Sequence, residues 1–269
     1  MKKTFLLLTL TLSLSILFAC DTGDTYRVAA SPTPHADILK EARTLIDDEY
    51  DFEIVTFNDY IMPNTALSEG DVDANYFQHI PYLEAQIEEH DYDFVNVGGI
   101  HIEPIGLYSK VHESLEDLPG TLEIILSNSP SDRPRLLGVL EDVDLITLKD
   151  DTSESDITDA NVDDLPDLFE SDKDVTFFEV APEQLYSNYD NESGDLVLIN
   201  GNFALDHGLN PLEDALALES GDSPYVNVLV AREDNADDPF IQALDDVLTS
   251  EEITQWIIDE YDGSVVIAD

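Results

Sequence analysis

The sequence predicts an α/β fold, in which short strands alternate with helices. The first observation is a set of segments with the length and pattern of strands, such as 26–31 and, with alternating apolar and polar residues, 52–57. The second is the helical spacing of apolar residues between those segments, as in Ile38, Ala42 and Leu45. Because the alternation continues along the chain, we expect mostly parallel sheets with helices on both faces.

Each element is predicted from its local pattern. The first helix should begin near Thr33 as N-cap, with Pro34 at the first helical position. The segment 149–173 has no clean period and is rich in Asp, Ser and Thr, which favours a solvated loop with one short helical turn. We expect further strands at 94–97, 122–126, 175–180, 196–199 and 225–231, and further helices at 82–89, 132–141, 182–189 and 238–261.

The N-terminus predicts export and lipid anchoring. Met1-Lys2-Lys3 precedes an apolar stretch that ends in Leu17-Phe18-Ala19-Cys20, which is typical of a secretory signal peptide over residues 1–19. The boundary resembles a bacterial lipobox, which implies acylation, palmitate included, of the single cysteine, Cys20, and a lipidated tether over 20–25. We therefore expect a protein anchored by lipid on the extracytoplasmic side of the cell membrane, periplasmic or facing the cell surface. An uncleaved signal anchor, or a nearby cleavage that leaves an odd thiol, is the alternative.

The charge of the chain is strongly negative. There are 60 acidic and 11 basic residues, giving a formal net charge of −49. Removing residues 1–19 takes away Lys2 and Lys3 and no acid, so the remaining chain carries −51. Such a chain repels nucleic acid, and its self-repulsion indicates an acidic, halophilic-type surface adapted to salty surroundings. Specific calcium binding is disfavoured, since the acidic stretch 149–170 lacks the glycine that an EF-hand loop needs.

No motif of a common enzyme class is present. GxGxxG, GxxxxGK[ST], GxSxG and HExxH are all absent from the sequence. We therefore expect no enzyme and no cofactor, although a nucleophile or carboxylate pair assembled only in space would escape this reading.

The segment 73–83 is the most informative internal stretch. It reads Asp-Ala-Asn-Tyr-Phe-Gln-His-Ile-Pro-Tyr-Leu and combines aromatic rings and a histidine without a clean strand or helix period. Such residues are typical of an apolar pocket wall with hydrogen-bonding tips, although core packing would also explain them.

This segment resembles the methionine-binding lipoproteins of bacterial ABC importers, the NlpA or MetQ family. Further stretches that carry the resemblance, in the order of the family, are 33–36 (Thr-Pro-His-Ala), 59–64 (Asp-Tyr-Ile-Met-Pro-Asn), 101–109 (His-Ile-Glu-Pro-Ile-Gly-Leu-Tyr-Ser), 199–205 (Ile-Asn-Gly-Asn-Phe-Ala-Leu) and 222–227 (Asp-Ser-Pro-Tyr-Val-Asn).

The resemblance implies a fold, an organisation and a function. The fold is that of a two-lobed periplasmic binding protein, type II-like, whose α/β lobes are joined by two crossover strands. Lobe I would comprise 26–105 plus 223–269, and lobe II 106–222. The protein would be a monomer that captures L-methionine or a close analogue and delivers it to the permease and ATPase of an ABC importer.

The resemblance also implies a set of ligand-binding residues. The side-chain pocket would be formed by Tyr60, Phe77, His79 and Tyr82. The amino acid backbone would be held by Arg135, Asn202 and Asn227. Aromatic rings suit a polarizable thioether, and a guanidinium suits a carboxylate. From the residues alone, His79 is equally explained as a structural histidine, Arg135 as a surface ion pair, and Asn200 and Asn202 as turn residues.

The chain departs from the family near Arg135. Asp132 stands where the family usually has Asn, and Pro134 where it has a small residue. Asp132 would either compete with the ligand carboxylate for Arg135 or accept the ligand ammonium.

A metal-binding surface lipoprotein is the alternative function. The six histidines show no i, i+4 pair, which leaves only a site assembled in space; they are His35, His79, His90, His101, His112 and His207.

Overall fold

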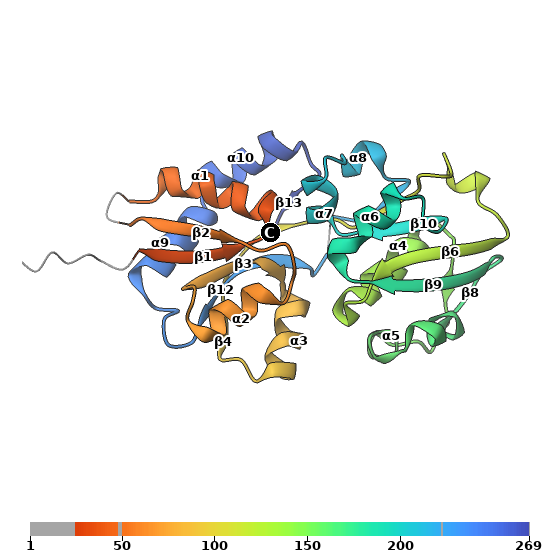
Figure 1. Ribbon diagram of the computed structural model, residues 1–269, viewed down its shortest axis with the longest axis horizontal. Coiled ribbons are helices and arrows are strands. Elements are labelled where there is room, and N and C mark those ends of the chain that lie inside the picture. The colour runs from red at the N-terminus through yellow and green to blue at the C-terminus, as the bar shows by residue number, and fades with distance from the viewer. Residues whose placement is uncertain (1–24, 48–49, 222, 269) are drawn as a thin grey trace, which may run out of the picture.

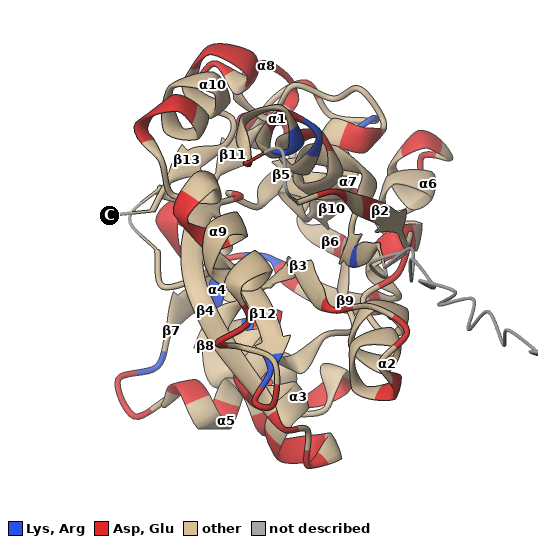
Figure 2. Ribbon diagram, turned by 90° about the vertical axis from the view of Figure 1, so that its left-hand side faces the viewer, with Lys and Arg blue, Asp and Glu red and all other residues tan. Residues whose placement is uncertain are grey.

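The chain folds into two α/β lobes that lie side by side (Figure 1). The computed structural model describes residues 25–47, 50–221 and 223–268, so the predicted signal peptide and Cys20 lie outside the described residues. Within these ranges every helix is too short or too polar to span a bilayer. Asp and Glu are spread over the helices of both lobes, whereas Lys and Arg are few (Figure 2).

The first lobe is built on a six-stranded sheet of order β13-β4-β12-β3-β1-β2. Its strands are β1 (Tyr26–Ala30), β2 (Phe52–Thr56), β3 (Ala74–His79), β4 (Phe94–Ile102), β12 (Val226–Arg232) and β13 (Val266–Ile267). Its helices are α1 (Asp37–Leu45), α2 (Met62–Glu69), α3 (Ile80–His90), α9 (Pro239–Leu248) and α10 (Glu251–Tyr261).

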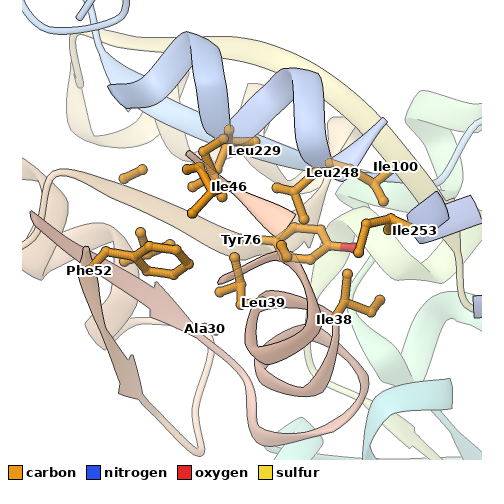
Figure 3. Close-up of a cluster of buried hydrophobic side chains, with 14 of the residues drawn as sticks. Ala30, Ile38, Leu39, Ile46, Phe52, Tyr76, Ile100, Leu229, Leu248 and Ile253 are labelled. Atoms are coloured by element: carbon orange, nitrogen blue, oxygen red, sulfur yellow. The ribbon is translucent and has the colours of Figure 1, made fainter. Parts of the chain in front are cut away.

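Alternation along the central strands sends side chains to both faces of this sheet. Val28 and Ala30 pack with α1, α9 and α10 in one core cluster, which Figure 3 shows around Tyr76 and Leu248. Ala29, between them in β1, packs with α2 and α3 in a second cluster. A strand buried on both faces reads as a continuous apolar run, which explains why 28–30 lacks a polar residue.

The second lobe repeats this arrangement on a five-stranded sheet of order β11-β5-β10-β6-β9. Ile124 of β6 faces a core cluster with α4, and Ile125 faces another with α6 and α7. The strands are β5 (Gly106–Tyr108), β6 (Thr121–Ser127), β9 (Asp174–Val180), β10 (Leu196–Ile199) and β11 (Ala217–Leu218). The helices are α4 (Arg133–Asp142), α5 (Glu154–Asp159), α6 (Leu185–Asp190), α7 (Gly201–Asp206) and α8 (Pro211–Asp214).

The chain crosses between the sheets twice, and the two crossings are neighbours. It leaves the first sheet after Ile102 of β4 and returns to it at Val226 of β12. These two residues are paired in the antiparallel ladder of β4 and β12. Both connections therefore emerge from the same edge of the first lobe, beside the site described below.

The expectation of mostly parallel sheets is wrong, because both sheets are mixed. β1 pairs in parallel with β2 and β3, whereas β12 runs antiparallel to both β3 and β4. The physical reason is the pair of crossings: β4 leads out of the first lobe and β12 leads back, so the two strands run in opposite directions.

Several local predictions also need correction. The segment 73–83 is not irregular, since it contains the buried strand β3 and the start of α3. The segment 238–261 forms two helices, α9 and α10, because Ser250 caps the second by accepting a hydrogen bond from the backbone N–H of Ile253.

The remaining corrections concern a loop and a helix cap. The segment 149–173 contains α5, the 3-10 helix Val162–Leu168 and strand β8 (Phe169–Glu170), which pairs with β7 (Thr147–Leu148). Thr33 is not an N-cap, because its side chain donates to the carboxylate of Asp37 and a non-α turn over Pro32–Ala36 precedes α1.

Candidate functional site

All seven binding residues implied by the resemblance line one cavity at the junction of the lobes. The space between its walls is about 380 Å³, part of which is open to solvent. The lining residues are Tyr60, Phe77, Gln78, His79, Tyr82, Glu103, Asp132, Arg135, Asn200, Gly201, Asn202 and Asn227.

A bulge between β3 and β12 directs the side chain of Phe77. Val228 and Leu229, adjacent in β12, pair with Gln78 and Tyr76 of β3, so Phe77 has no partner in the ladder with β12. A bulge of this kind re-aims a side chain, and the side chain of Phe77 lines the cavity. Tyr60 lies in the loop before α2.

Three rings form the apolar wall. The centroids of Tyr60, Phe77 and Tyr82 lie 6.0–6.2 Å from one another, with the Phe77 and Tyr82 rings edge to face. Phe203 of α7, which belongs to the other lobe, packs on Tyr60, with 5.3 Å between the two ring centroids. Two hydrogen bonds hold the wall in place. Tyr82 Oη donates to the Tyr60 carbonyl at 2.9 Å, and Tyr60 Oη donates to Asn202 Oδ1 at 2.7 Å.

Two predicted residues at the polar end, Asn202 and Asn227, lie beside the crossings. Asn202 is on the first turn of α7, and its backbone N–H donates to Glu103 Oε2 at 3.1 Å. Asn227 of β12 accepts from His35 Nε2 through its Oδ1 at 3.1 Å. Gly201 makes this packing possible, since a Cβ there would lie 3.0 Å from Glu103 Cβ and 3.1 Å from the Pro104 carbonyl.

Arg135 is buried and not part of a surface ion pair. Its Nε donates to Glu219 Oε2 at 3.1 Å, and its Nη2 donates to the same carboxylate. Nη2 also donates to the Glu103 backbone carbonyl at 2.8 Å. Its guanidinium also stacks on Tyr225, with 4.3 Å between Cζ and the ring centroid. The Nε–Nη2 edge, the bidentate fork expected to meet a ligand carboxylate, therefore holds Glu219, and Nη1 lies 4.0 Å from Asp132 Oδ1.

His79 and Asp132 join the two lobes at the cavity. The backbone N–H of Tyr82 donates to His79 Nδ1 at 3.1 Å, so the ring proton lies on Nε2, which donates to Asp132 Oδ1 at 3.0 Å. Burial raises the pKa of Asp132, but the His79 hydrogen bond and the charge of Arg135 outweigh it and leave the pKa below its usual value. Asp132 is therefore a buried anion.

Glu103 connects two buried histidines behind the cavity. His101 Nε2 donates to Glu103 Oε1 at 2.8 Å, while Tyr76 donates to His101 Nδ1. His35 Nε2 lies 3.3 Å from the same oxygen. Burial lowers the pKa of His35 to about 4 and that of His101 to about 3, and raises the pKa of Glu103.

Within the described ranges, His35, His101 and Glu103 form the group of side chains that could hold a metal ion. Their ligand atoms lie within 4.8 Å of one another. However, the Nε2 atoms carry the protons that Glu103 and Asn227 accept, so a metal would have to displace hydrogen bonds that already satisfy the carboxylate.

Sequence reasoning gave no role to several residues that line the cavity or contact its lining, Gln78 and Gly201 among them. Glu103 and Phe203 lie inside stretches that carry the family resemblance, but no local pattern gave either a role. Asn200 was explained by turn chemistry alone. Glu219 lies 84 residues from Arg135, and nothing in the sequence pairs the two.

The fold and the site together define a two-lobed substrate-binding protein, with its cavity between α/β lobes that are linked by two crossings. The model of the NlpA lipoprotein family matches residues 26–268, and the chain belongs to this family of substrate-binding lipoproteins, which are not enzymes.

Named relatives cover nearly the whole chain. It is 41% identical over 276 residues to the methionine-binding lipoprotein MetQ of Bacillus subtilis, covering 99% of this chain and 98% of that protein. It is 37% identical over 234 residues to the D-methionine-binding lipoprotein MetQ of Yersinia pestis, covering 85% and 83%. A solved nutrient-binding protein from Burkholderia cenocepacia, bound to methionine, is 33% identical with a TM-score of 0.82, covering 91% of this chain and 100% of that one.

Proposed function

We propose that this chain is a lipid-anchored solute-binding protein of an ABC importer, which captures L-methionine or a close analogue and delivers it to the permease. The observation that carries the proposal is a cavity in which a three-ring wall faces a set of amide, guanidinium and carboxylate groups. Its relatives named for methionine support the choice of ligand, and their description as lipoproteins supports the anchor at Cys20 on the extracytoplasmic side.

The apolar wall suits a thioether. A sulfur–aromatic contact contributes about 0.3–1.5 kcal/mol, and burying a methionine-sized side chain contributes about 1.5–3 kcal/mol. Micromolar capture requires a net of about 8 kcal/mol, so the polar end must contribute the larger part after ordering costs. The site therefore recognises both the side chain and the free amino acid backbone.

Capture is coupled to closure of the lobes. We place the lobes at 26–105 plus 223–269 and at 106–222. The hydrogen bonds from Tyr60 to Asn202 and from His79 to Asp132 cross between them. A ligand that touches both walls binds the closed form better than an open one, and this difference shifts the population toward closure. The permease would then receive the closed form.

Calorimetry in high salt tests the proposal. The purified chain is titrated with L- and D-methionine, with leucine and glutamate, and with Zn²⁺ and Mn²⁺. Saturable heat with methionine supports the proposal, whereas heat with a divalent metal alone would favour the metal-binding alternative at His35, His101 and Glu103. The same titration with Phe77→Ala tests the aromatic wall. Its control is Phe178→Ala, since Phe178 is an exposed aromatic residue of β9 outside the cavity.

A further inference from the structure

Asp132 is a buried anion whose nearest Lys or Arg nitrogen lies at the distance limit of an ion pair. It is 1% exposed, and its carboxylate accepts from His79 Nε2 at 3.0 Å and from Asn200 Nδ2 at 3.1 Å. Within the described residues, the one Lys or Arg nitrogen within 4.0 Å of it is Nη1 of Arg135, at that limit. Since these two donors use only part of the acceptor capacity of a carboxylate, the group is able to accept further hydrogen bonds.

Asn200 presents an unused acceptor beside this carboxylate. Its side chain is 5% exposed, and its Oδ1 has no hydrogen-bond partner within the described part of the chain. The orientation of the amide is fixed, because turning it over would place Oδ1 against the carboxylate of Asp132 instead of a donor. Among the cavity-lining side chains described, Asn200 Oδ1 is the one buried polar atom left without a partner.

The charge balance of the site favours a cation as ligand group. Glu103 and Asp132 line the cavity with Arg135, and Arg135 is already paired with Glu219. A ligand ammonium would offset this excess of carboxylates, whereas a ligand carboxylate would add to it.

We propose that Asp132 and Asn200 together form the seat of the ligand ammonium, and that the ammonium contributes more to recognition than the ligand carboxylate. The proposal rests on the proposed function and adds to it a chemical selection: the site takes a primary amine attached to a thioether chain. Three N–H donors of an ammonium match the carboxylate of Asp132 and the free oxygen of Asn200. Asp132, where the chain departs from its family, would then determine ligand choice.

Two truncated ligands test the proposal on the unmodified protein. Methylthiopropylamine is methionine without its carboxylate, and methylthiobutyric acid is methionine without its amine, so neither adds bulk. We expect the amine to bind about tenfold or more tightly than the acid, since a hydrogen bond to a charged group contributes this much. If the acid binds as tightly as the amine while methionine binds well, the inference is overturned and the proposed function stands. If none of the three binds, both fail.

Two variants separate binding from folding. Asp132→Asn should weaken methionine about tenfold or more and leave methylthiobutyric acid unchanged, because it removes the negative charge that the ammonium would meet and the acid has no group at that position. Its matched control is Asp195→Asn, which breaks another Asp–His pair, that of Asp195 Oδ1 and His112 Nε2 at 3.0 Å, outside the cavity. Equal weakening of both ligands, or a gain in methionine affinity, contradicts the inference. If Asp132→Asn fails to fold, the comparison of the two truncated ligands on the unmodified protein decides.

Discussion

The imidazole of His79 donates to the carboxylate of Asp132 across the two lobes, with 3.0 Å between Nε2 and Oδ1. The direction of this bond is fixed by the backbone N–H of Tyr82, which occupies the other ring nitrogen. This bond joins the end of β3 to the start of α4 at the cavity, between residues that are 53 positions apart in the chain. The same bond keeps Asp132 anionic where a ligand would lie.

Phe77→Ala should weaken methionine binding about tenfold to a hundredfold, since the ring supplies both apolar area and a sulfur contact. Calorimetry measures the dissociation constant, with Phe178→Ala as control. An unchanged constant would mean that the bulged position of Phe77 has no role in the site. Because Phe77 is 3% exposed, melting curves must accompany the titration.

Glu219→Gln should lower the free energy of unfolding by about 3–5 kcal/mol, because it leaves the buried guanidinium of Arg135 without its carboxylate. Asp190→Asn, which breaks the exposed pair with Lys110, should leave the free energy of unfolding nearly unchanged, because solvent screens that pair. Urea unfolding in high salt measures both. A similar small loss in the two variants would show that the Arg135–Glu219 pair does not stabilise the fold.

Acidification should destabilise the protein through its buried histidines. His35 and His101 have folded pKa values of about 4 and about 3, below the value near 6.5 expected when unfolded. Their contribution is therefore complete above about pH 6.5 and is lost as pH falls toward the folded values, at about 1.4 kcal/mol per unit for each. The raised pKa of Glu103 acts in the opposite direction, and it does so above the usual pKa of that carboxyl. The window of about pH 5 to 6.5 therefore reports the sum of both effects, which a variant of a single histidine separates.

His101→Gln isolates this effect. The free energy of unfolding of the variant should depend on pH less steeply than that of the unmodified protein, by up to one proton across this window. Urea titrations at several pH values give the two slopes. Parallel slopes would show that His101 is not held neutral by burial.

Stability should rise steeply with salt, because the chain without residues 1–19 carries 51 net negative charges spread over both lobes (Figure 2). Raising the ionic strength from about 0.1 M to 1 M shortens the screening length from about 10 Å to 3 Å and so weakens the repulsion. Melting temperatures across this range measure the effect. A melting temperature independent of salt would contradict the halophilic interpretation of the surface.

The fold was largely predictable where the apolar pattern is local. β10 begins and ends where the sequence predicts, at Leu196 and Ile199, because a short apolar run between polar residues indicates a buried strand. β3 was not predicted, since Ala74–His79 is polar at Asn75 and Gln78. Both amides are buried in the structure, where Gln78 Nε2 donates to Asn64 and Asn75 and Asn75 Nδ2 donates to Asn64. A network of this kind satisfies polar groups inside a strand, and no single-residue pattern reveals it.

The family resemblance named seven residues that share the cavity, but it gave none of their contacts. Short motifs carry Tyr60, Phe77, His79 and Tyr82, and the structure brings them to one cavity with Arg135, Asn202 and Asn227. The partner of Arg135 was not predictable, because Glu219 lies far along the chain in a protein with 60 acidic residues.

By itself, the sequence determined the alternation of strands and helices, the excess of acidic charge and the kinds of side chain offered to a ligand, since each depends on composition or on local spacing. Only the tertiary structure decided which acids meet which donors. It placed Asp132 against His79 and Asn200 and gave Arg135 to Glu219, because the two chain crossings bring distant segments to one junction where burial allows few partners.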